Sequence, residues 1–443
     1  MQFGRHIGKG LWAFADKTLP VLYGLGLVFL VARVLPREEY GAFVLVQTVF
    51  NIFSAFTYTI ALQPLTKFAA ETDRYGGYAA AALILQLIVF FAASLILLLV
   101  RGPVAHVLDP SGQTHGLLIF VPLLLAASLY RNFSTSYLQS HFSMQRIFWI
   151  NTVYFLGTMM VVAGLKRAQM LHSAAELLGV SAVAYACSSL LAVFLTPVKF
   201  EISGLRKSLR TMWQFGKFLM GGNIAYMLYS QADVFVATSF GGPAAAASYY
   251  NAKLFTRFFD LQGQVLQSSL VPLISRLTQR KSAGELVAVV EKSVCFSLIV
   301  LAPVFLVMFF LPQPLLHVMF RGRYEDSAPM VRIFSFLALL VPWNGTAVSY
   351  LIGSGRVKPG MWLGLLQLVV GAVLYLILTY LLGVQGLAVG FVLTIAILTI
   401  FLIVLVRQDL PLTAAGVLRR SADVWRYFRS WSSFFSDETQ KSA

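Results

Sequence analysis

The sequence predicts an all-α polytopic membrane protein whose twelve transmembrane helices form two six-helix bundles, related by a pseudo-twofold axis along the membrane normal. Three observations lead to this prediction. Of 443 residues, 58% are hydrophobic and only 12% are charged, with a mean hydropathy of +0.76. Apolar stretches long enough to span a bilayer, about 20 residues each, recur along the chain. Short motifs of the first half reappear in the second half.

The apolar stretches give the expected helices in chain order. The basic N-terminus lacks a small-residue cleavage site, so the first stretch is expected to be a retained helix and not a signal peptide. The twelve expected spans are residues 11–34, 41–63, 79–101, 116–138, 147–166, 174–197, 214–240, 248–271, 287–312, 328–353, 358–382 and 384–406.

Three short matches between the halves indicate a tandem duplication of a six-helix unit, because they occur in order and at nearly one offset, about 210 residues. They pair Phe3-Gly4-Arg5 with Phe215-Gly216-Lys217, Pro64-Leu65 with Pro272-Leu273, and Ser136-Tyr137-Leu138 with Ser349-Tyr350-Leu351. The predicted organisation is an N-terminal six-helix lobe (1–197), a basic cytoplasmic linker (198–213), a C-terminal six-helix lobe (214–406) and a cytoplasmic amphipathic tail (407–443).

The distribution of positive charge predicts the orientation. The net charge is +16, and most of the 34 Lys and Arg residues fall in the even-to-odd connections and the two tails. Cytoplasmic connections carry an excess of Lys and Arg, so we expect both termini in the cytoplasm. Three basic residues, Lys17, Lys253 and Arg257, lie well inside spans and need a separate explanation.

The first span contains an adjacent charge pair, Asp16 and Lys17. A charged residue at the centre of a bilayer costs about 2.5–3.5 kcal/mol on insertion scales, and such residues face a bundle interior or a water-filled cavity. We therefore expect this span to line a transport path.

The eighth span carries the strongest polar signal, a ridge formed by Lys253, Arg257, Asp260, Gln264 and Gln267. Steps of four and three residues place all five on one helix face. One interpretation is a structural network in which carboxylates neutralise the two cations. The other is a site for an anionic substrate, because the cations outnumber the carboxylate on this face.

Other spans contain further polar candidates. Asn51 belongs to a polar face of the second span, and Asn223 and Asp233 belong to one in the seventh. Lipid cannot satisfy such groups, so these faces should look inward. Arg131, near the predicted cytoplasmic end of the fourth span, either lines the path or extends to the membrane interface.

No catalytic motif or metal-binding spacing is present in the sequence. Cys187 and Cys295 are predicted inside different spans, where a thiol is typically a small buried apolar group. The six histidines are scattered, and neither a phosphate-binding Gly-Lys-Ser/Thr loop nor a Gly-x-Ser-x-Gly turn occurs. The predicted outside connections are too short for a catalytic domain, so the sequence favours transport.

Five segments resemble a known family. They are Ala32-Arg33-Val34-Leu35-Pro36-Arg37-Glu38-Glu39-Tyr40-Gly41, Pro272-Leu273-Ile274-Ser275, Phe320-Arg321-Gly322, Gly353-Ser354-Gly355-Arg356-Val357-Lys358 and Gly386-Leu387-Ala388-Val389-Gly390. They are similar to the O-antigen-type, Wzx-like polysaccharide flippases of the multidrug/oligosaccharidyl-lipid/polysaccharide exporter (MOP) superfamily. The resemblance implies two lobes in a V shape and a cationic lumen, to which Lys17, Lys253 and Arg257 correspond by position. The Asp16-Lys17 pair departs from that pattern, since the carboxylate would neutralise Lys17.

The expected function is that of a flippase and not of an enzyme. It moves an undecaprenyl-diphosphate-linked oligosaccharide, an O-antigen (lipopolysaccharide) or exopolysaccharide repeat unit, to the periplasmic face of the bacterial inner membrane by alternating access through a cationic cleft. The alternatives are a cation-coupled multidrug antiporter of the same superfamily and a membrane glycan polymerase or ligase. The candidate substrate-binding residues are Lys17, Lys253, Arg257, Gln264, Asn51, Asn223 and Arg131, and the candidate ion-coupling residues are Asp16, Asp233 and Asp260.

The expected partners follow from this function. They are the lipid-linked glycan, the lipid bilayer, a polysaccharide polymerase and chain-length proteins, with the transporter itself a monomer. No nucleic acid, metal or cofactor is expected, apart from H⁺ or Na⁺ as a coupling ion.

Overall fold

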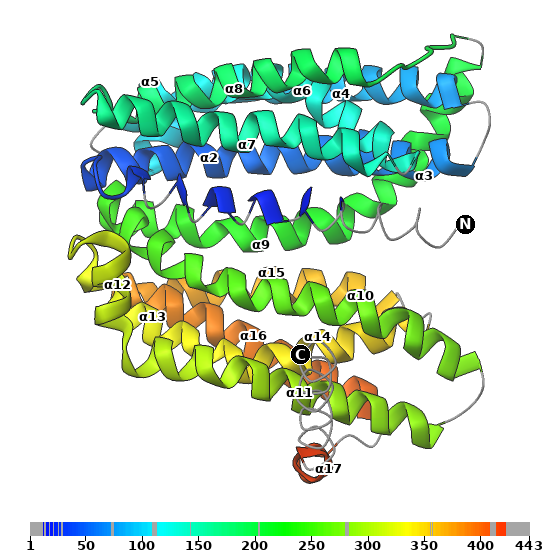
Figure 1. Cartoon of the computed structure of the whole chain (residues 1–443), viewed down its shortest axis with the longest axis vertical. Helices are drawn as coiled ribbons and strands as arrows, with labels where there is room; N and C mark the ends of the chain where they lie inside the picture. Colours follow the sequence, from blue (N-terminus) through cyan, green and yellow to red (C-terminus); the bar gives the residue numbers. More distant parts are fainter. Residues whose placement is uncertain are drawn as a thin grey trace, which may run out of the picture. The chain divides into compact units, whose positions relative to one another are not determined.

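The computed structural model describes residues 12, 15–16, 18–20, 22–24, 26–27, 30–71, 75–108, 113–141, 143–202, 204–279, 283–354, 356, 358–407 and 413–421. Within these ranges the regular secondary structure is helical and contains no strand (Figure 1). The predicted all-α polytopic class is therefore confirmed.

The helices of the first half follow the expected spans closely. They are α2 (Arg37–Thr57), a π-helical turn η1 (Tyr58–Leu62), α3 (Gln63–Glu71), α4 (Tyr75–Leu108), α5 (Gln113–Leu117), α6 (Phe120–Ser140), α7 (Met144–Arg167) and α8 (Ala174–Leu195). Local sequence explains several helix starts. Glu38 and Glu39 occupy the first turn of α2, where carboxylates interact well with the helix dipole. Ser173 and Glu176 form a capping box at the start of α8.

The second half contains longer and more broken helices. They are α9 (Leu205–Lys253), a 3-10 turn η2 (Leu254–Thr256), α10 (Arg257–Gln279), α11 (Ala283–Phe310), α12 (Pro312–Phe320), η3 (Glu325–Ser327), α13 (Ala328–Ser335), α14 (Leu337–Gly353), α15 (Lys358–Leu382), α16 (Gln385–Arg407) and α17 (Ala414–Arg419). The predicted basic linker is already helical from Leu205 onward.

Eight helical stretches of the described ranges are long and apolar enough to cross a membrane, and a ninth is added if the bent pair Glu325–Ser335 and Leu337–Gly353 is one span. The helices α9 and α10 are not among them. These two carry the polar faces predicted for the seventh and eighth spans, which lowers their hydropathy. A polar face on a spanning helix is expected where the helix lines a protein interior or an aqueous path.

The chain divides into two compact units. Unit 1 comprises Met1–Asn251, His317–Glu325 and Tyr375–Leu387; unit 2 comprises Ala252–Leu316, Asp326–Leu374 and Ala388–Ala443. The division falls at the end of α9, so most of that helix belongs to unit 1. The lobe boundaries at 1–197 and 214–406, and the twofold axis inferred from the matches between the two halves of the sequence, remain predictions.

Each unit has its own apolar core. In unit 1, Leu65, Ala82 and Phe133 of α3, α4 and α6 belong to one buried cluster. In unit 2, Ile274 of α10 and Leu351 of α14 belong to another. Buried packing of this kind fixes neighbouring helices in place and gives each unit a rigid frame for its polar groups.

The long helix α9 contains a break that the sequence analysis did not anticipate. Gly242 has φ 71° and ψ −177°, and Pro243 follows it. A positive φ is readily adopted only by glycine, and proline lacks the N–H that would continue the hydrogen-bond ladder. The residues from Pro243 to Lys253 therefore form a separate helical segment.

The tenth span contains Pro342-Trp343-Asn344-Gly345, where a proline and a glycine predict a kink, but the structure has its bend elsewhere. The 42° bend lies between Ser335 and Leu337, and α14 continues through Pro342. Neighbouring turns can accommodate a proline when packed helices support the freed backbone groups. The bend therefore precedes the proline by more than one helical turn.

Unit 1 includes the segment His317–Glu325, which is anchored by Arg33 in the connection before α2 and by Arg37, the first residue of α2. The Arg33 guanidinium donates from Nε to the Met319 carbonyl (2.7 Å) and from Nη2 to the Val318 carbonyl (2.6 Å). These carbonyls end α12, where cationic side chains are favourable.

Arg37 makes a parallel contact with the same segment. Its guanidinium donates to the Arg323 carbonyl and lies 5.0 Å from the centroid of the buried Tyr324 ring. Arg323 in turn donates to the Ala32 carbonyl at 3.3 Å. We call the contacts of Arg33, Arg37 and Arg323 the arginine clasp.

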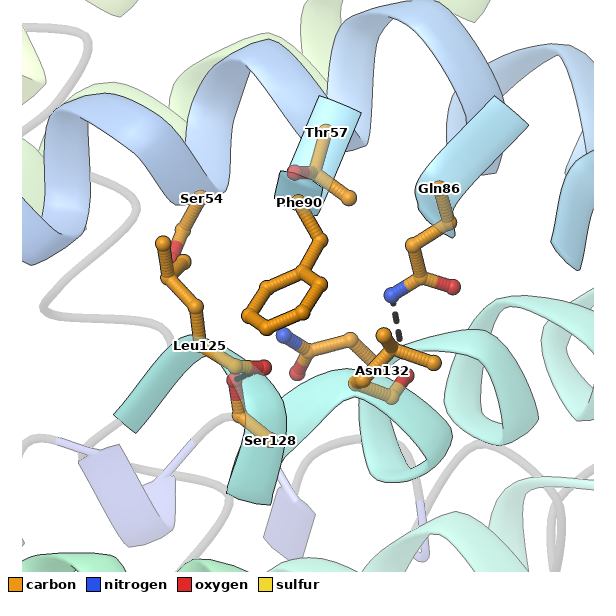
Figure 2. A pocket seen from close by; sticks show the side chains of 8 residues that line it. Ser54, Thr57, Gln86, Phe90, Leu125, Ser128 and Asn132 are labelled. Carbon is orange, nitrogen blue, oxygen red and sulfur yellow. Dashed lines mark hydrogen bonds between the residues drawn. The ribbon is translucent and has the colours of Figure 1, made fainter. Parts of the chain in front are cut away.

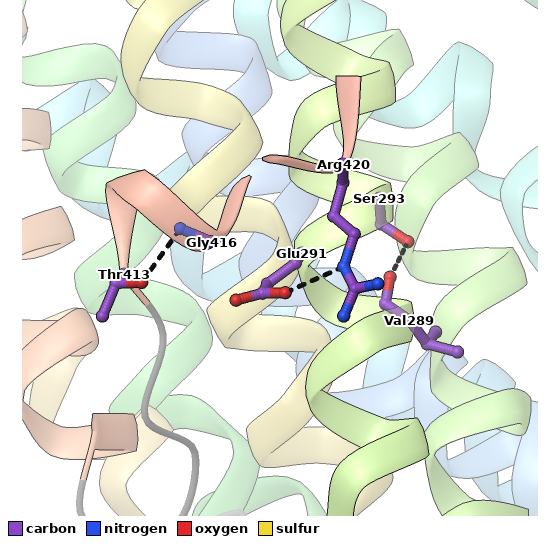
Figure 3. A network of polar contacts seen from close by, with 6 residues as sticks. All are labelled: Val289, Glu291, Ser293, Thr413, Gly416 and Arg420. Atoms are coloured by element: carbon purple, nitrogen blue, oxygen red, sulfur yellow. Dashed lines mark hydrogen bonds and ion pairs between the residues drawn. The ribbon is translucent and has the colours of Figure 1, made fainter. Parts of the chain in front are cut away.

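In unit 2, the short helix α17 docks on α11 (Figure 3). The Arg420 Nε lies 3.1 Å from the Glu291 Oε2, and Glu291 is 6% exposed. Val417 is buried in one apolar cluster with Val294 of α11, and Trp343 of α14 packs against this cluster. An ion pair and an apolar contact therefore hold α17. The predicted amphipathic tail beyond residue 421 lies outside the described residues.

Candidate functional site

Unit 1 contains a hydrogen-bonded chain that joins an arginine to a carboxylate through one amide. The Arg131 Nη2, on α6, donates to the Asn151 Oδ1 of α7 at 2.6 Å. The Asn151 Nδ2 donates to the Asp16 Oδ1 at 2.6 Å, and Asp16 is 9% exposed. The structure thus brings together two predicted site residues, Arg131 and Asp16, which are 115 positions apart, through a third residue.

Aromatic rings surround the guanidinium of Arg131. Its Cζ lies 4.9 Å from the ring centroid of Tyr154, 5.5 Å from that of Tyr185 and 5.7 Å from that of Phe155. Tyr154 and Tyr185 are themselves stacked at 3.9 Å. Ring faces attract cations, and each such contact contributes more where water is excluded. We call Arg131, Asn151, Asp16 and these rings the Arg131 cluster.

Asp233 occupies a different environment in unit 1. It is fully buried in α9, where its Oδ2 accepts from the Tyr249 hydroxyl at 2.7 Å and its Oδ1 from the Val234 N–H at 2.8 Å. Tyr249 follows the break at Gly242, so the break brings a donor back to this carboxylate. Hydrogen bonds of this kind stabilise a charged carboxylate in a low-dielectric interior.

The polar ridge of the eighth span lies at the beginning of unit 2, with a different local geometry from the one predicted. Lys253 ends α9, Leu254–Thr256 form a 3-10 turn, and Arg257 begins α10. A 3-10 turn has 3.0 residues per turn and not 3.6, so the helical phase shifts between the two cations. The prediction of one continuous α-helical ridge is therefore wrong between Lys253 and Arg257.

The ridge residues still form one charged cluster. Asp260 is close enough to Lys253 and Arg257 to interact electrostatically with both. The Lys253 Nζ lies 5.4 Å from the ring centroid of Phe391 of α16. Lys253 and Arg257 are half-buried, whereas Asp260 and Gln264 are exposed. This arrangement combines two cations, one carboxylate and one amide, and can bind an anion with additional hydrogen bonds.

Three remaining candidates are less informative. Asn51 accepts a long hydrogen bond from Gln47 on the same helix, at 3.4 Å. The backbone of Asn223 lies in α9, but its side chain is outside the described part of the structure. Lys17 also lies outside the described residues.

The sequence analysis missed two residues that complete these sites, Asn151 and Tyr249. Asn151 is followed by Tyr154 and Thr158 at steps of three and four residues, and this polar stripe was the signal that could have found it. Tyr249 has a hydroxyl that becomes relevant only because α9 breaks. Within the described ranges, no group of three or more His, Cys, Asp or Glu is arranged to hold a metal ion.

Comparison with protein families gives one match over most of the chain. The family model described as "Polysaccharide biosynthesis protein" matches residues 30–329. An uncharacterised membrane protein of Methanocaldococcus jannaschii is 25% identical over 360 residues, covering 76% of this chain and 71% of that protein.

Solved structures share the fold at low sequence identity. An inward-facing multidrug resistance MATE family transporter of the MOP superfamily has a TM-score of 0.74 and 14% identity. The match covers 93% of this chain and 98% of the transporter's chain. The lipid II flippase MurJ, in an inward closed conformation, has a TM-score of 0.73 and 11% identity. The match covers 93% of this chain and 90% of the MurJ chain. These similarities confirm the predicted twelve-helix, two-bundle fold class, and the neighbours are transporters and not enzymes.

Proposed function

We propose that this chain, which belongs to the polysaccharide biosynthesis protein family, is a flippase of the MOP superfamily, in line with its fold, and that it flips an undecaprenyl-diphosphate-linked oligosaccharide. The glycan-bearing head moves from the cytoplasmic to the periplasmic face of the inner membrane by alternating access, while the lipid tail stays in the bilayer.

The ridge of unit 2 is the observation that carries this proposal. Lys253 and Arg257 are two cations near one carboxylate, Asp260, and Gln264 adds an amide on the next turn. Positive charge in a membrane protein is costly unless an anion or dipole balances it. A diphosphate or an acidic sugar supplies that anion, and guanidinium and ammonium groups are common ligands for phosphate oxygens.

Charge reversal tests this assignment. We expect Lys253→Glu combined with Arg257→Glu to abolish flipping of a fluorescent lipid-diphosphate-linked glycan in proteoliposomes. Arg407→Glu, which reverses an exposed charge of the same unit, should leave flipping near the wild-type rate. Size-exclusion profile and Tm must be unchanged in both variants, so that misfolding is excluded. Normal flipping by the folded double variant would remove the ridge from the substrate path.

Ion coupling is a second part of the proposal. Asp16 is nearly buried and is bonded to a neutral amide, so its charge can change without breaking a direct ion pair with Arg131. Asp233 and Asp260 are the other carboxylates that could bind H⁺ or Na⁺. Flipping should accelerate under an imposed pH gradient or sodium gradient, and Asp16→Asn should remove that acceleration. Equal rates with and without either gradient would contradict coupling.

The fold also matches MATE transporters, so a multidrug antiporter is the competing function. A cavity for cationic drugs should be rich in carboxylates, whereas this chain has cations at Arg131, Lys253 and Arg257. Ethidium efflux from cells expressing the protein distinguishes the two. Efflux that depends on Asp260, without glycan flipping, would favour the antiporter.

The cellular setting belongs to the same proposal. We place the protein in the bacterial inner membrane as a monomer with both termini cytoplasmic, serving O-antigen or exopolysaccharide assembly beside a polymerase and chain-length proteins. Cysteines introduced at the two ends of the chain should react with a membrane-impermeant maleimide only after permeabilisation. Reaction in intact spheroplasts would reverse the orientation.

A further inference from the structure

A small pocket lies inside unit 1, between α2, α4 and α6 (Figure 2). Five polar side chains line it: Ser54 and Thr57 from α2, Gln86 from α4, and Ser128 and Asn132 from α6. Apolar groups, including Leu125, complete the wall. Thr57 is the last residue before the π-helical turn η1, and π-helical turns frequently occur at functional positions.

Two of these side chains have buried polar atoms without a hydrogen-bond partner among the described residues, the Ser54 Oγ and the Gln86 Oε1. Gln86 is 2% exposed, and its Nε2 donates to the Leu129 carbonyl at 2.9 Å, which fixes the amide in position. A buried polar atom left unpaired costs about 1–3 kcal/mol. Two such atoms lining one pocket indicate that a ligand satisfies them.

The chemistry of the wall defines this ligand as a hydrogen-bond donor. The Thr57 hydroxyl donates to the Phe53 carbonyl at 3.1 Å and the Ser128 hydroxyl to the Leu125 carbonyl at 3.2 Å, so both oxygens remain available only as acceptors. The Gln86 Oε1 is an acceptor as well.

A cation is disfavoured in this pocket. None of the lining residues is a carboxylate, and the Arg131 Nη1 donates to the Asn132 Oδ1 at 3.0 Å. The Arg131 guanidinium thus keeps a fixed positive charge next to the wall. A small neutral donor that can also accept a bond from the Ser54 hydroxyl is a water molecule, which typically makes two to four hydrogen bonds in buried sites.

We propose that this pocket is a structural hydration site, in which ordered water binds the Ser54 Oγ and the Gln86 Oε1 and contacts Asn132. The water then extends the chain that runs from Asp16 through Asn151 and Arg131 to Asn132. Its role is to solvate the Asn132 end of this hydrogen-bonded chain, whereas Asp16 lies at the other end. The inference does not depend on the identity of the transported molecule.

Hydroxyl-radical footprinting tests the site on the full chain in lipid nanodiscs. X-ray radiolysis converts bound water into radicals that label the nearest side chains, and Leu125 is a suitable reporter because it is only 8% exposed. We expect labelling of Leu125 in the wild-type protein and a loss of more than about threefold in Ser54→Val, whose larger apolar side chain excludes water from the pocket. Ser94→Val is the matched control, because its buried hydroxyl on α4 lies outside the pocket.

Several results would overturn the proposal. They are absence of the label at Leu125 in the wild-type protein, and an unchanged label in Ser54→Val. A label that disappears when sodium chloride replaces choline chloride would show that the pocket binds a cation and not water. If Ser54→Val fails to fold, Ser54→Ala removes the same polar partner without added volume, and it should weaken the label as well. Since none of these measurements needs transport, they remain decisive if the proposed substrate is wrong.

Discussion

Arg131 in unit 1 and the pair Lys253 and Arg257 in unit 2 are cations in apolar chain segments, but their surroundings differ. Arg131 donates to two side-chain amides, faces three aromatic rings and reaches Asp16 through one of the amides. Lys253 lies 5.4 Å from the ring centroid of Phe391, and the ridge it shares with Arg257 contains the exposed Asp260.

This difference separates two uses of buried charge. A cation enclosed by neutral donors and acceptors is part of the packing, and its removal leaves groups unpaired. Arg131, Lys253 and Arg257 are all half-buried, but the carboxylate beside the ridge, Asp260, is exposed. The ridge cations can therefore exchange partners, because water or substrate can take the place of that carboxylate. We therefore expect substitutions at Arg131 to change stability first, and substitutions on the ridge to change transport first.

The largest effect should come from Arg131→Met. Loss of the guanidinium leaves the Oδ1 atoms of Asn151 and Asn132 without their donor. Removing the charged partner from such hydrogen bonds costs about 1.5–3 kcal/mol each. Thermal unfolding of the purified protein should show a clearly lower Tm. Arg131→Lys should recover only part of the loss, because an ammonium group cannot donate in the planar fork geometry. A normal Tm with lost flipping would instead place Arg131 in the substrate path.

A smaller loss is expected for Asn151→Leu. This amide connects Arg131 to Asp16, so its removal breaks two short hydrogen bonds and should destabilise unit 1 by about 1–3 kcal/mol. Asn51→Leu is the matched control, because among the residues that the structure describes the side chain of Asn51 has one hydrogen bond, the long 3.4 Å contact with Gln47. Equal Tm shifts for both leucine variants would mean that the Asn151 bridge adds nothing specific.

The docked helix α17 offers an intermediate case. Arg420 is one-third exposed while its partner Glu291 is nearly buried, so the pair combines features of both sites. We expect Arg420→Ala to cost about 1 kcal/mol and to increase proteolysis near residue 420. In a double-mutant cycle with Glu291→Gln, the coupling should account for most of that cost. Independent effects of the two substitutions would show that Val417 alone holds α17.

The smallest stability effect should come from Lys253→Met. The cation–π contact with Phe391 contributes about 0.5–1 kcal/mol, and the carboxylate near Lys253, Asp260, is exposed, where a charge pair contributes little. The Tm should therefore hardly change while flipping falls more than tenfold. Phe391→Leu should give the same small Tm change. This variant removes the ring contact but keeps the charge of Lys253, so comparing its flipping rate with that of Lys253→Met separates the two contributions. A large Tm loss in Lys253→Met would make the ridge as structural as the Arg131 cluster and would remove the contrast between the units.

The sequence predicted the class of the fold well, because hydropathy and helix length depend mainly on composition. It also predicted which residues form the ridge from Arg257 to Gln267, since these residues lie in one α-helix, α10, where their spacing places them on one face. It could not predict the 3-10 turn before Arg257, because local propensities for α and 3-10 turns are similar. The bend of the tenth span was assigned to Pro342, whereas packing places it near Phe336.

The polar sites were harder to predict than the spans. Asp16 and Arg131 were both candidates, but nothing in the sequence relates them. Asn151, Tyr154 and Thr158 recur at steps of three and four residues, and this spacing places them on one helix face without naming their partners on other helices. The partner of Asp233 depends on the break at Gly242, which redirects the helix carrying Tyr249. Tertiary contacts of this kind join residues whose separation along the chain carries no information about their distance.

The arginine clasp has a consequence for how this protein can diverge. Arg33 binds the carbonyls of Val318 and Met319, and the Val318 side chain itself is 70% exposed. A contact made to main-chain oxygens depends on the path of the backbone at the end of α12 and not on its side chains. Position 318 is therefore free to vary during evolution, whereas an insertion or deletion near the end of α12 would move both acceptors out of reach. We expect homologous chains to keep the length of this segment while its residues change.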